Sequence, residues 1–228
     1  MLKGADISKW QGYDFNIDPH DFIIMKATEG MTYTDPTFSH NVDRCIVADK
    51  LIGAYHYARP ENNTPVEEAY NFLRVVKPYL GNILLALDWE GEALNHDIAW
   101  ALEWMNIVYT ETGVRPVLYC SESQVKKFGV IASQNYGLWV AKWSDDEPKV
   151  EPWKFWALWQ YTSKPYDKDY FAGTREQFLA YCKSNKENGI TCAGCEAIEC
   201  LKRYADNIEL LAHNLRTELG AIMAKKGV

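Results

Sequence analysis

Apolar and polar positions along residues 1–184 follow two different periods. Seven short stretches carry apolar residues in continuous or alternating positions, as strands do: residues 4–7, 22–27, 51–57, 83–87, 116–119, 138–141 and 155–160. Four other stretches repeat apolar residues at helical spacing: residues 37–49, 64–76, 97–112 and 175–183. Pro65 directly after Thr64 marks one helix start, because proline fits the first turn behind a capping threonine.

This order of elements predicts the fold class. Strands joined by helices pair in parallel, and the number of strands favours a closed or nearly closed barrel over an open, doubly wound sheet. We therefore predict an α/β protein with an irregular, TIM-like (β/α) barrel. The chemistry of such barrels lies at the C-terminal ends of the strands. This sequence places polar residues there: Asp6, Lys26, Tyr57, Asp88, Glu90, Tyr119 and Gln160.

The composition changes near residue 184. All nine tryptophans precede it, and Tyr204 is the only aromatic residue after it. Beyond a polar linker, apolar residues recur every seven positions, at Leu201, Ile208, Leu215 and Ile222. This spacing predicts an amphipathic helix with a coiled-coil-like seam, which favours a homo-oligomer. We therefore divide the chain into a barrel domain, residues 1–184, and a small α-helical C-terminal segment, residues 185–228.

The six cysteines do not form the pattern of a disulfide framework. Three of them stand singly in ordinary globular sequence, where a thiol behaves as a small hydrophobe: Cys45, Cys120 and Cys182. The other three lie close together: Cys192, Cys195 and Cys200. They leave free thiols, a disulfide, or a zinc site completed by Cys182 as open alternatives. We expect no metal or other cofactor in the barrel.

Composition also narrows the partners. The net charge of −7 argues against nucleic acid, because phosphate contacts need clustered lysine and arginine. No segment approaches the roughly 18 apolar residues of a membrane span. The first residues lack the apolar region of a secretion signal, so synthesis in a reducing compartment is expected. The chain has 9 Trp, 14 Tyr and 8 Phe, which suit either a carbohydrate cleft or simple core packing.

The strongest chemical signal is the segment LLALDWE at residues 84–90. An apolar run ends in two carboxylates one residue apart, and side chains at i and i+2 of a strand share a face. Asp88 and Glu90 would therefore project side by side, with Cβ atoms roughly 6–7 Å apart. Like charges this close push their pKa values apart, so one group stays protonated while the other is ionised. Glycosidic bond cleavage needs such a pair, a proton donor and an anion facing the oxocarbenium ion.

His56 also invites a catalytic interpretation. It lies between Tyr55 and Tyr57, so in a strand its side chain faces away from both of them. We therefore expect a core histidine with a satisfied ring nitrogen.

Seven sequence blocks in the same order resemble glycoside hydrolase family 25, the lysozymes (N-acetylmuramidases) common among phage endolysins and bacterial wall hydrolases. The blocks are GADISKWQG at 4–12, IMKATEG at 24–30, GAYHYAR at 53–59, LDWE at 87–90, RPVLY at 115–119, LWVA at 138–141 and WQYTS at 159–163. The resemblance covers about residues 1–184. It implies an irregular β/α barrel that cleaves the β-1,4 bond between N-acetylmuramic acid and N-acetylglucosamine of bacterial peptidoglycan, with retention of configuration.

The resemblance also implies roles for individual residues. Glu90 would be the general acid/base. Asp88 would be the second carboxylate, which either attacks the anomeric carbon or steadies an intermediate formed by the substrate's N-acetyl group. Asp6 and Asp167 would complete an acidic cluster, although Asp169 could face the cleft in place of Asp167. The residues that would bind the sugar are Lys26, Tyr33, Tyr57, Tyr119, Trp139 and Gln160.

Two other functions compete with this one. A chitinase-like glycosidase would carry acidic residues at i, i+2 and i+4 of one strand, but Ala86 occupies the first of these positions. A catalytically silent wall-binding barrel would typically have lost a carboxylate, and this sequence keeps all of them. The C-terminal segment would form an oligomer or bind the cell wall. Because no secretion signal is seen, we expect an endolysin held in the host cytoplasm before its release to the wall.

Overall fold

The computed structural model describes residues 1–184. The predicted C-terminal helix, its role, the domain limit near residue 184, and the state of Cys192, Cys195 and Cys200 lie outside the described residues. Within residues 1–184, no helix has the length and hydrophobicity that crossing a membrane requires.

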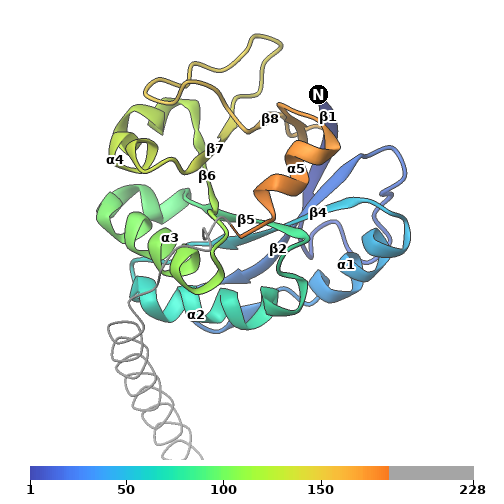
Figure 1. Ribbon diagram of the computed structural model, residues 1–228, viewed down its shortest axis with the longest axis horizontal. Helices are drawn as coiled ribbons and strands as arrows, with labels where there is room; N and C mark the ends of the chain where they lie inside the picture. The colour runs from blue at the N-terminus through green and yellow to red at the C-terminus, as the bar shows by residue number, and fades with distance from the viewer. Residues whose placement is uncertain (185–228) are drawn as a thin grey trace, which may run out of the picture. The chain divides into compact units, whose positions relative to one another are not determined.

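Eight strands close into the predicted barrel (Figure 1). Around the ring they are β1 (Leu2–Ile7), β9 (Lys168–Phe171), β8 (Leu158–Thr162), β7 (Gly137–Ala141), β6 (Val117–Ser121), β5 (Ile83–Asp88), β4 (Leu51–Tyr57) and β2 (Phe22–Glu29). Parallel pairing of β1 with β2 completes the ring. A two-residue strand, β3 (Tyr33–Thr34), pairs with β2.

Two strands were not predicted, and both run antiparallel to their neighbours. β9 pairs antiparallel with β8 and β1, because residues 163–167 between β8 and β9 are too few for a crossover to a parallel strand. β3 returns along β2 after a turn at Gly30, whose φ of 56° suits glycine. The prediction of parallel pairing alone was therefore wrong at these two places. The strand predicted at 155–160 begins later, at Leu158.

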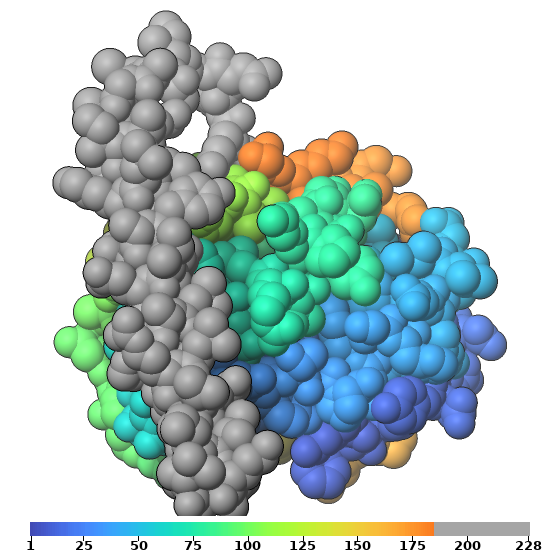
Figure 2. Space-filling view, turned by 90° about the horizontal axis from the view of Figure 1, so that it is seen from below, coloured from blue at the N-terminus to red at the C-terminus, as the bar shows by residue number. Residues whose placement is uncertain are grey.

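The helices lie around the strands at the predicted places. They are α1 (Phe38–Val47), α2 (Pro65–Val76), α3 (Ile98–Thr112) and α5 (Arg175–Tyr181), with the short, unpredicted α4 (Gly129–Ser133). Three 3₁₀ helices join them: η1 (Lys77–Tyr79), η2 (Gly91–Asn95) and η3 (Glu122–Phe128). Thr64 caps α2 in a reciprocal capping box with Glu67. Figure 2 shows part of the outer face of the protein, on which the segments coloured blue to teal form a continuous surface.

The interior of the barrel is filled with apolar side chains toward its N-terminal end. α5 closes this end (Figure 1). The centre of the Phe178 ring lies 5.4 Å from that of Phe22 and 5.1 Å from that of Phe171. A Cβ atom added to Gly4 would lie 2.3 Å from the Phe22 ring, so this position requires glycine. The apolar filling leaves the C-terminal ends of the strands for polar side chains.

Candidate active site

The interior-facing positions of the barrel change from apolar to polar at the C-terminal strand ends. On β5, Leu84 and Ala86 belong to the interior core, and Asp88 continues the same row two residues later. These strand ends surround a cavity of about 400 Å³. It is lined by nine of the sequence-predicted residues: Asp6, Lys26, Tyr57, Asp88, Glu90, Tyr119, Trp139, Gln160 and Asp167. Tyr33, the tenth, lines an adjoining cavity.

Asp88 and Glu90 reach this acidic cavity at different depths. The backbone of Glu90 is extended just past β5, with φ −145° and ψ −174°, so both carboxyl groups face the cavity. Asp88 is buried and Glu90 is exposed. Burial, and then the charge of Glu90, raise the pKa of Asp88 well above its usual range. Although Glu90 is the more exposed of the two, its partial burial and the charge of Asp167 also raise its pKa. Both groups therefore hold a proton to higher pH than an ordinary carboxyl group does.

Gln160 holds Asp6 in place. Its Nε2 donates to Oδ2 of Asp6 at 2.9 Å, and its Oε1 accepts from the Tyr119 hydroxyl at 3.1 Å and the Trp143 indole at 3.0 Å. Burial and the charge of Asp167 raise the pKa of Asp6 to about 7, although the hydrogen bond from Gln160 lowers it. Gln160 therefore orients Asp6 and links it to two aromatic side chains.

Asp167 and Asp169 occupy different environments. Asp167 precedes β9, is half-buried and lines the acidic cavity. Asp169 is fully buried on β9, and its Oδ1 accepts a hydrogen bond from the Trp139 indole at 2.8 Å. Of the two, Asp167 is the residue that can reach a substrate. Within residues 1–184, no group of three or more His, Cys, Asp or Glu side chains could hold a metal ion.

Lys26 is the only cation among the described residues that line the acidic cavity. The pairing of β2 with β4 shifts between Lys26 and Thr28, and this irregularity accompanies an ion pair between Lys26 and Glu29. Nζ of Lys26 lies 4.6 Å from the centre of the Tyr57 ring. The charge of Lys26 lowers the pKa of the two carboxyl groups beyond it, Asp88 and Glu90, and so opposes the effect of burial.

A second cavity, of about 870 Å³, adjoins the acidic cavity and shares Lys26, Tyr57 and Trp10 with it. Tyr33 and Arg59 are among the other residues that line it. Because the two cavities share lining residues, we treat them as one groove, whose lining combines aromatic and charged side chains. Such a lining suits a polar ligand with apolar faces, as sugar rings are.

Three aromatic residues at the acidic cavity were not predicted as binding residues: Tyr55, Trp10 and Trp143. Trp10 is 83% exposed and Trp143 is 65% exposed, so both indoles are available to a ligand. Alternation along β4 could have identified Tyr55, because it shares a face with Tyr57. The two tryptophans lie in loops after β1 and β7, where no periodic pattern marks them.

His56 is a core residue, as predicted. Its Nδ1 lies 2.8 Å from the Thr28 hydroxyl, its Nε2 lies 2.6 Å from the Glu68 carboxylate, and its ring stacks on Trp104. Burial lowers the pKa of His56 and so favours its neutral ring, although the hydrogen bond and the charge of Glu68 oppose this effect. Glu68 and Trp104 belong to α2 and α3, so His56 faces the helices and not the acidic cavity.

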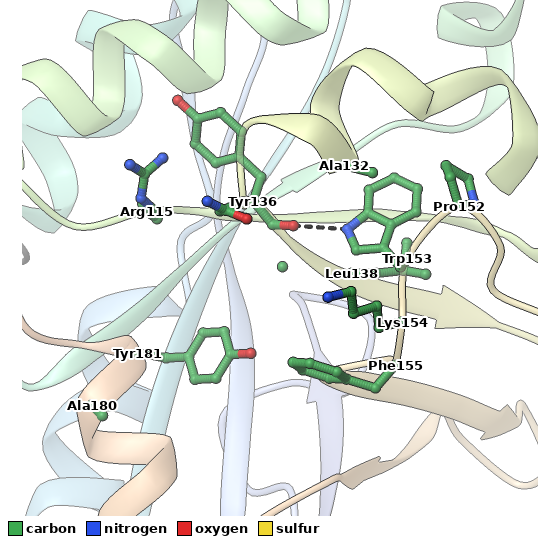
Figure 3. A pocket seen from close by; sticks show the side chains of 12 residues that line it. Arg115, Ala132, Tyr136, Leu138, Pro152, Trp153, Lys154, Phe155, Ala180 and Tyr181 are labelled. Atoms are coloured by element: carbon green, nitrogen blue, oxygen red, sulfur yellow. Dashed lines mark hydrogen bonds between the residues drawn. The ribbon is translucent and has the colours of Figure 1, made fainter.

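Another cavity, of about 580 Å³, lies near the N-terminal end of the barrel, between the start of β7, the end of α5 and residues 152–155 (Figure 3). Trp153 forms one wall and donates its indole N–H to the Tyr136 carbonyl at 2.7 Å. Tyr181 and Phe155 also line the cavity (Figure 3). Its described lining contains no Asp or Glu, so acid-catalysed hydrolysis has no candidate residues there.

The acidic cavity at the C-terminal strand ends has the residues and the position of a glycosidase site. The family model of the glycosyl hydrolases family 25 matches residues 5–170. The chain belongs to glycosyl hydrolase family 25. It is therefore a glycoside hydrolase, as predicted, and its irregular α/β barrel is the fold of that family.

Known proteins are similar to this family 25 chain over most of its length. It is 28% identical over 209 residues to the protein YegX of Escherichia coli (strain K12), covering 82% of this chain and 75% of that protein. It is 26% identical over 210 residues to Lysozyme M1 of Streptomyces globisporus, covering 78% of this chain and 70% of the lysozyme. The structure of a family GH25 lysozyme from Aspergillus fumigatus matches with a TM-score of 0.69 and 26% identity, covering 80% of this chain and 99% of that one.

Proposed function

We propose that this family 25 chain is a peptidoglycan hydrolase that cleaves the β-1,4 bond between N-acetylmuramic acid and N-acetylglucosamine. The observation that carries the proposal is the convergence of four carboxyl groups on one cavity at the open end of the barrel: Asp6, Asp88, Glu90 and Asp167. The relatives named lysozyme support the choice of substrate. The exposed indoles of Trp10 and Trp143 beside the carboxyl groups support a sugar ligand.

Glu90 is the proposed general acid/base. It is the exposed member of the pair at the end of β5, so it can reach the oxygen of a bound glycosidic bond. Burial and the charge of Asp167 raise its pKa, which keeps a proton on Glu90 to higher pH than an ordinary glutamate would hold it. That proton is the one donated to the leaving sugar. The ionised Glu90 then activates water for the second step.

Asp88 is the proposed second carboxylate, with two alternatives for its role. It attacks the anomeric carbon, or it steadies the intermediate that the substrate's own N-acetyl group forms; both routes retain the anomeric configuration. Either role requires an ionised Asp88 beside a protonated Glu90. Activity should therefore depend on pH as a bell, with an acid limb where the pair loses its first proton and an alkaline limb where it loses the second.

The predicted binding residues divide by burial into two groups. Lys26, Tyr33 and Tyr57 line the second cavity of the groove, and we assign them to direct contact with the sugar chain. Trp139 is 2% exposed and Gln160 is 4% exposed, and each donates a hydrogen bond to a carboxyl group. These two, with Tyr119 bonded to Gln160, act mainly by orienting the acidic residues.

The test is mass spectrometry of purified bacterial walls digested with the wild-type protein and with Glu90→Gln. We expect fragments with muramic acid at the new reducing end, formed by the wild type at a rate at least about 100-fold above the variant. Glu92→Gln is the matched control, because Glu92 is exposed two residues away and does not line the acidic cavity; it should digest walls as the wild type does.

Each other outcome contradicts a part of the proposal. Glucosamine at the new reducing ends would overturn the bond specificity, and equal digestion by Glu90→Gln would overturn the role of Glu90. Absence of fragments from the wild type would leave a wall-binding barrel. Preferential cleavage of chitin oligomers would favour a chitinase-like glycosidase.

A further inference from the structure

Asp169 is a buried carboxyl group that lacks the partners an ionised carboxylate needs. Its side chain is fully buried on β9, and its Oδ1 accepts the hydrogen bond from Trp139. Its other oxygen, Oδ2, is buried without a hydrogen-bond partner among the described residues. A full negative charge is strongly unfavourable in such a place. A proton on or near Oδ2 would remove the cost of burying that charge.

Asp6 is the group positioned to share that proton. The register of β1 with β9 pairs Asp169 with Gly4, and Asp6 follows Gly4 by two positions, so Asp6 and Asp169 share the interior face. Hydrogen bonding between the two carboxyl groups, which requires a proton on one of them, raises the pKa of Asp169 and lowers that of Asp6. Because Gln160 already donates to Oδ2 of Asp6, the other oxygen of Asp6 is left for Asp169.

The surroundings do not favour two negative charges. The largest influences on Asp169, after its burial, are the charges of Asp6 and Asp167 and the Trp139 hydrogen bond. Asp6 is acted on further by the charge of Glu90 beyond β5, and Tyr119 on β6 faces both Asp6 and Asp169. These groups are acidic or neutral. Lys26, the cation of the acidic cavity, acts on Asp88 and Glu90.

We propose that Asp6 and Asp169 share a single proton, so that the pair carries one negative charge and Asp169 fixes the position of Asp6. The proton lies between Oδ2 of Asp169 and the oxygen of Asp6 that Gln160 leaves free. Asp169 does not reach the substrate and is therefore a positioning residue. Only the link to catalysis rests on the proposed function, in which Asp6 belongs to the acidic cluster. The shared proton itself does not depend on that function.

The variant Asp169→Asn tests the shared proton. Its amide keeps an oxygen for Trp139 and offers an N–H to Asp6, so the geometry is kept while the proton is removed. In the wild type the folded pair holds a proton that the unfolded chain loses above about pH 4, so the unfolding constant rises about tenfold per pH unit as the pH increases toward about 7. Asp169→Asn lacks the shared proton, so its unfolding constant lacks this part of the pH dependence.

The measurement is urea denaturation of the full chain between about pH 5 and 7, where the ratio of wild-type to Asp169→Asn unfolding constants should rise about tenfold per pH unit. Asp145→Asn, which changes an exposed aspartate, is the control and should keep the wild-type dependence. A ratio that is independent of pH would overturn the proposal. Because no substrate is used, the result does not depend on peptidoglycan being cleaved.

Two further measurements separate a shared proton from a structural role. Asp6→Asn removes the same proton from the other side, so the double variant should lose no more pH dependence than either single variant. In the wild type, the carboxyl ¹³C signals of Asp6 and Asp169 should move together at one pH midpoint. The sharing would be contradicted if the double variant lost more pH dependence than either single variant. It would also be contradicted if the two signals titrated independently at ordinary aspartate pKa values.

Discussion

The substitution Gln160→Glu would place a fifth carboxyl group against the acidic cluster. It exchanges the nitrogen that donates to Asp6 for an oxygen and keeps the acceptor of Tyr119 and Trp143. Shape is almost unchanged, so any effect must come from charge. The hydrogen bond between residue 160 and Asp6 then needs a proton on one of the two carboxyl groups, because two ionised ones have no hydrogen to share.

The distance in the structure sets the size of the effect. With the single negative charge of the Asp6–Asp169 pair on Asp6, two unit charges 2.9 Å apart, the present separation of Gln160 Nε2 and Asp6 Oδ2, repel by about 6 kcal/mol at an effective dielectric constant of about 20. Spreading each charge over two oxygens lowers this to about 4 kcal/mol, which raises the pKa of the new carboxyl group by about three units. It therefore titrates near pH 7 in the folded protein, against about 4.3 in the unfolded chain.

A pKa raised in the folded state makes stability fall as the pH rises through the interval between the two values. The variant should lose about 1 kcal/mol relative to the wild type near pH 4, and about 1.4 kcal/mol more for each pH unit up to about 7. A deficit of about 5 kcal/mol near pH 7 corresponds to a melting temperature lower by about 10–20 °C.

Urea denaturation of both proteins at several pH values measures this difference. Gln134→Glu makes the same chemical change at an exposed position, so its stability should differ little from that of the wild type at any of these pH values. A difference between Gln160→Glu and the wild type that stays constant from about pH 4 to 7 would refute the proposed electrostatic coupling between residue 160 and Asp6.

Three further predictions follow from contacts around the groove. Glu68→Leu should destabilise the fold by about 3–5 kcal/mol in urea denaturation, because buried Glu68 accepts from His56 and the Arg59 amide, whereas Glu68→Gln should cost about 1 kcal/mol. Lys26→Met should raise the pKa of both Asp88 and Glu90, so the limbs of the pH profile of kcat/KM should move to higher pH; unmoved limbs would contradict the coupling. Trp10→Ala should raise KM on soluble wall fragments severalfold with little change in kcat, and should alter stability by less than about 0.5 kcal/mol; a fall in kcat alone would exclude a binding role.

The long periodic segments explain why much of the barrel could be predicted from the sequence. The strand predicted at 51–57 is present with the same bounds, and the helix predicted at 64–76 begins one residue later, after its cap. β3 and β9 were not predicted, because strands of two and four residues are too short to show a repeating pattern of apolar positions. Antiparallel closure by β9 depends on the short connection after β8, which a pattern of alternating strands and helices does not reveal.

The acidic residues of the site differ in how visible they were. Asp88 and Glu90 could be recognised from strand alternation alone, because two residues along one strand determine their placement. Asp6 could be singled out as a polar residue at a predicted strand end, but its place beside Asp167 needed the family resemblance, since only the closed ring brings the first and last strands together. The hydrogen bond between Gln160 and Asp6 joins residues 154 positions apart, so no local pattern could have indicated that Gln160 orients a carboxyl group.

The choice of hydrogen-bond donors explains how this acidic cavity can keep protons near neutral pH. Asp6 and Asp169 receive their hydrogen bonds from the amide of Gln160 and the indole of Trp139, which are uncharged. A lysine or arginine in either place would hold the carboxyl group ionised, because an adjacent cation lowers the pKa. Lys26, the cation that does line the cavity, is paired with Glu29, so part of its charge is already offset. Uncharged donors thus orient the carboxyl groups and still let burial keep their pKa values high, as acid catalysis requires.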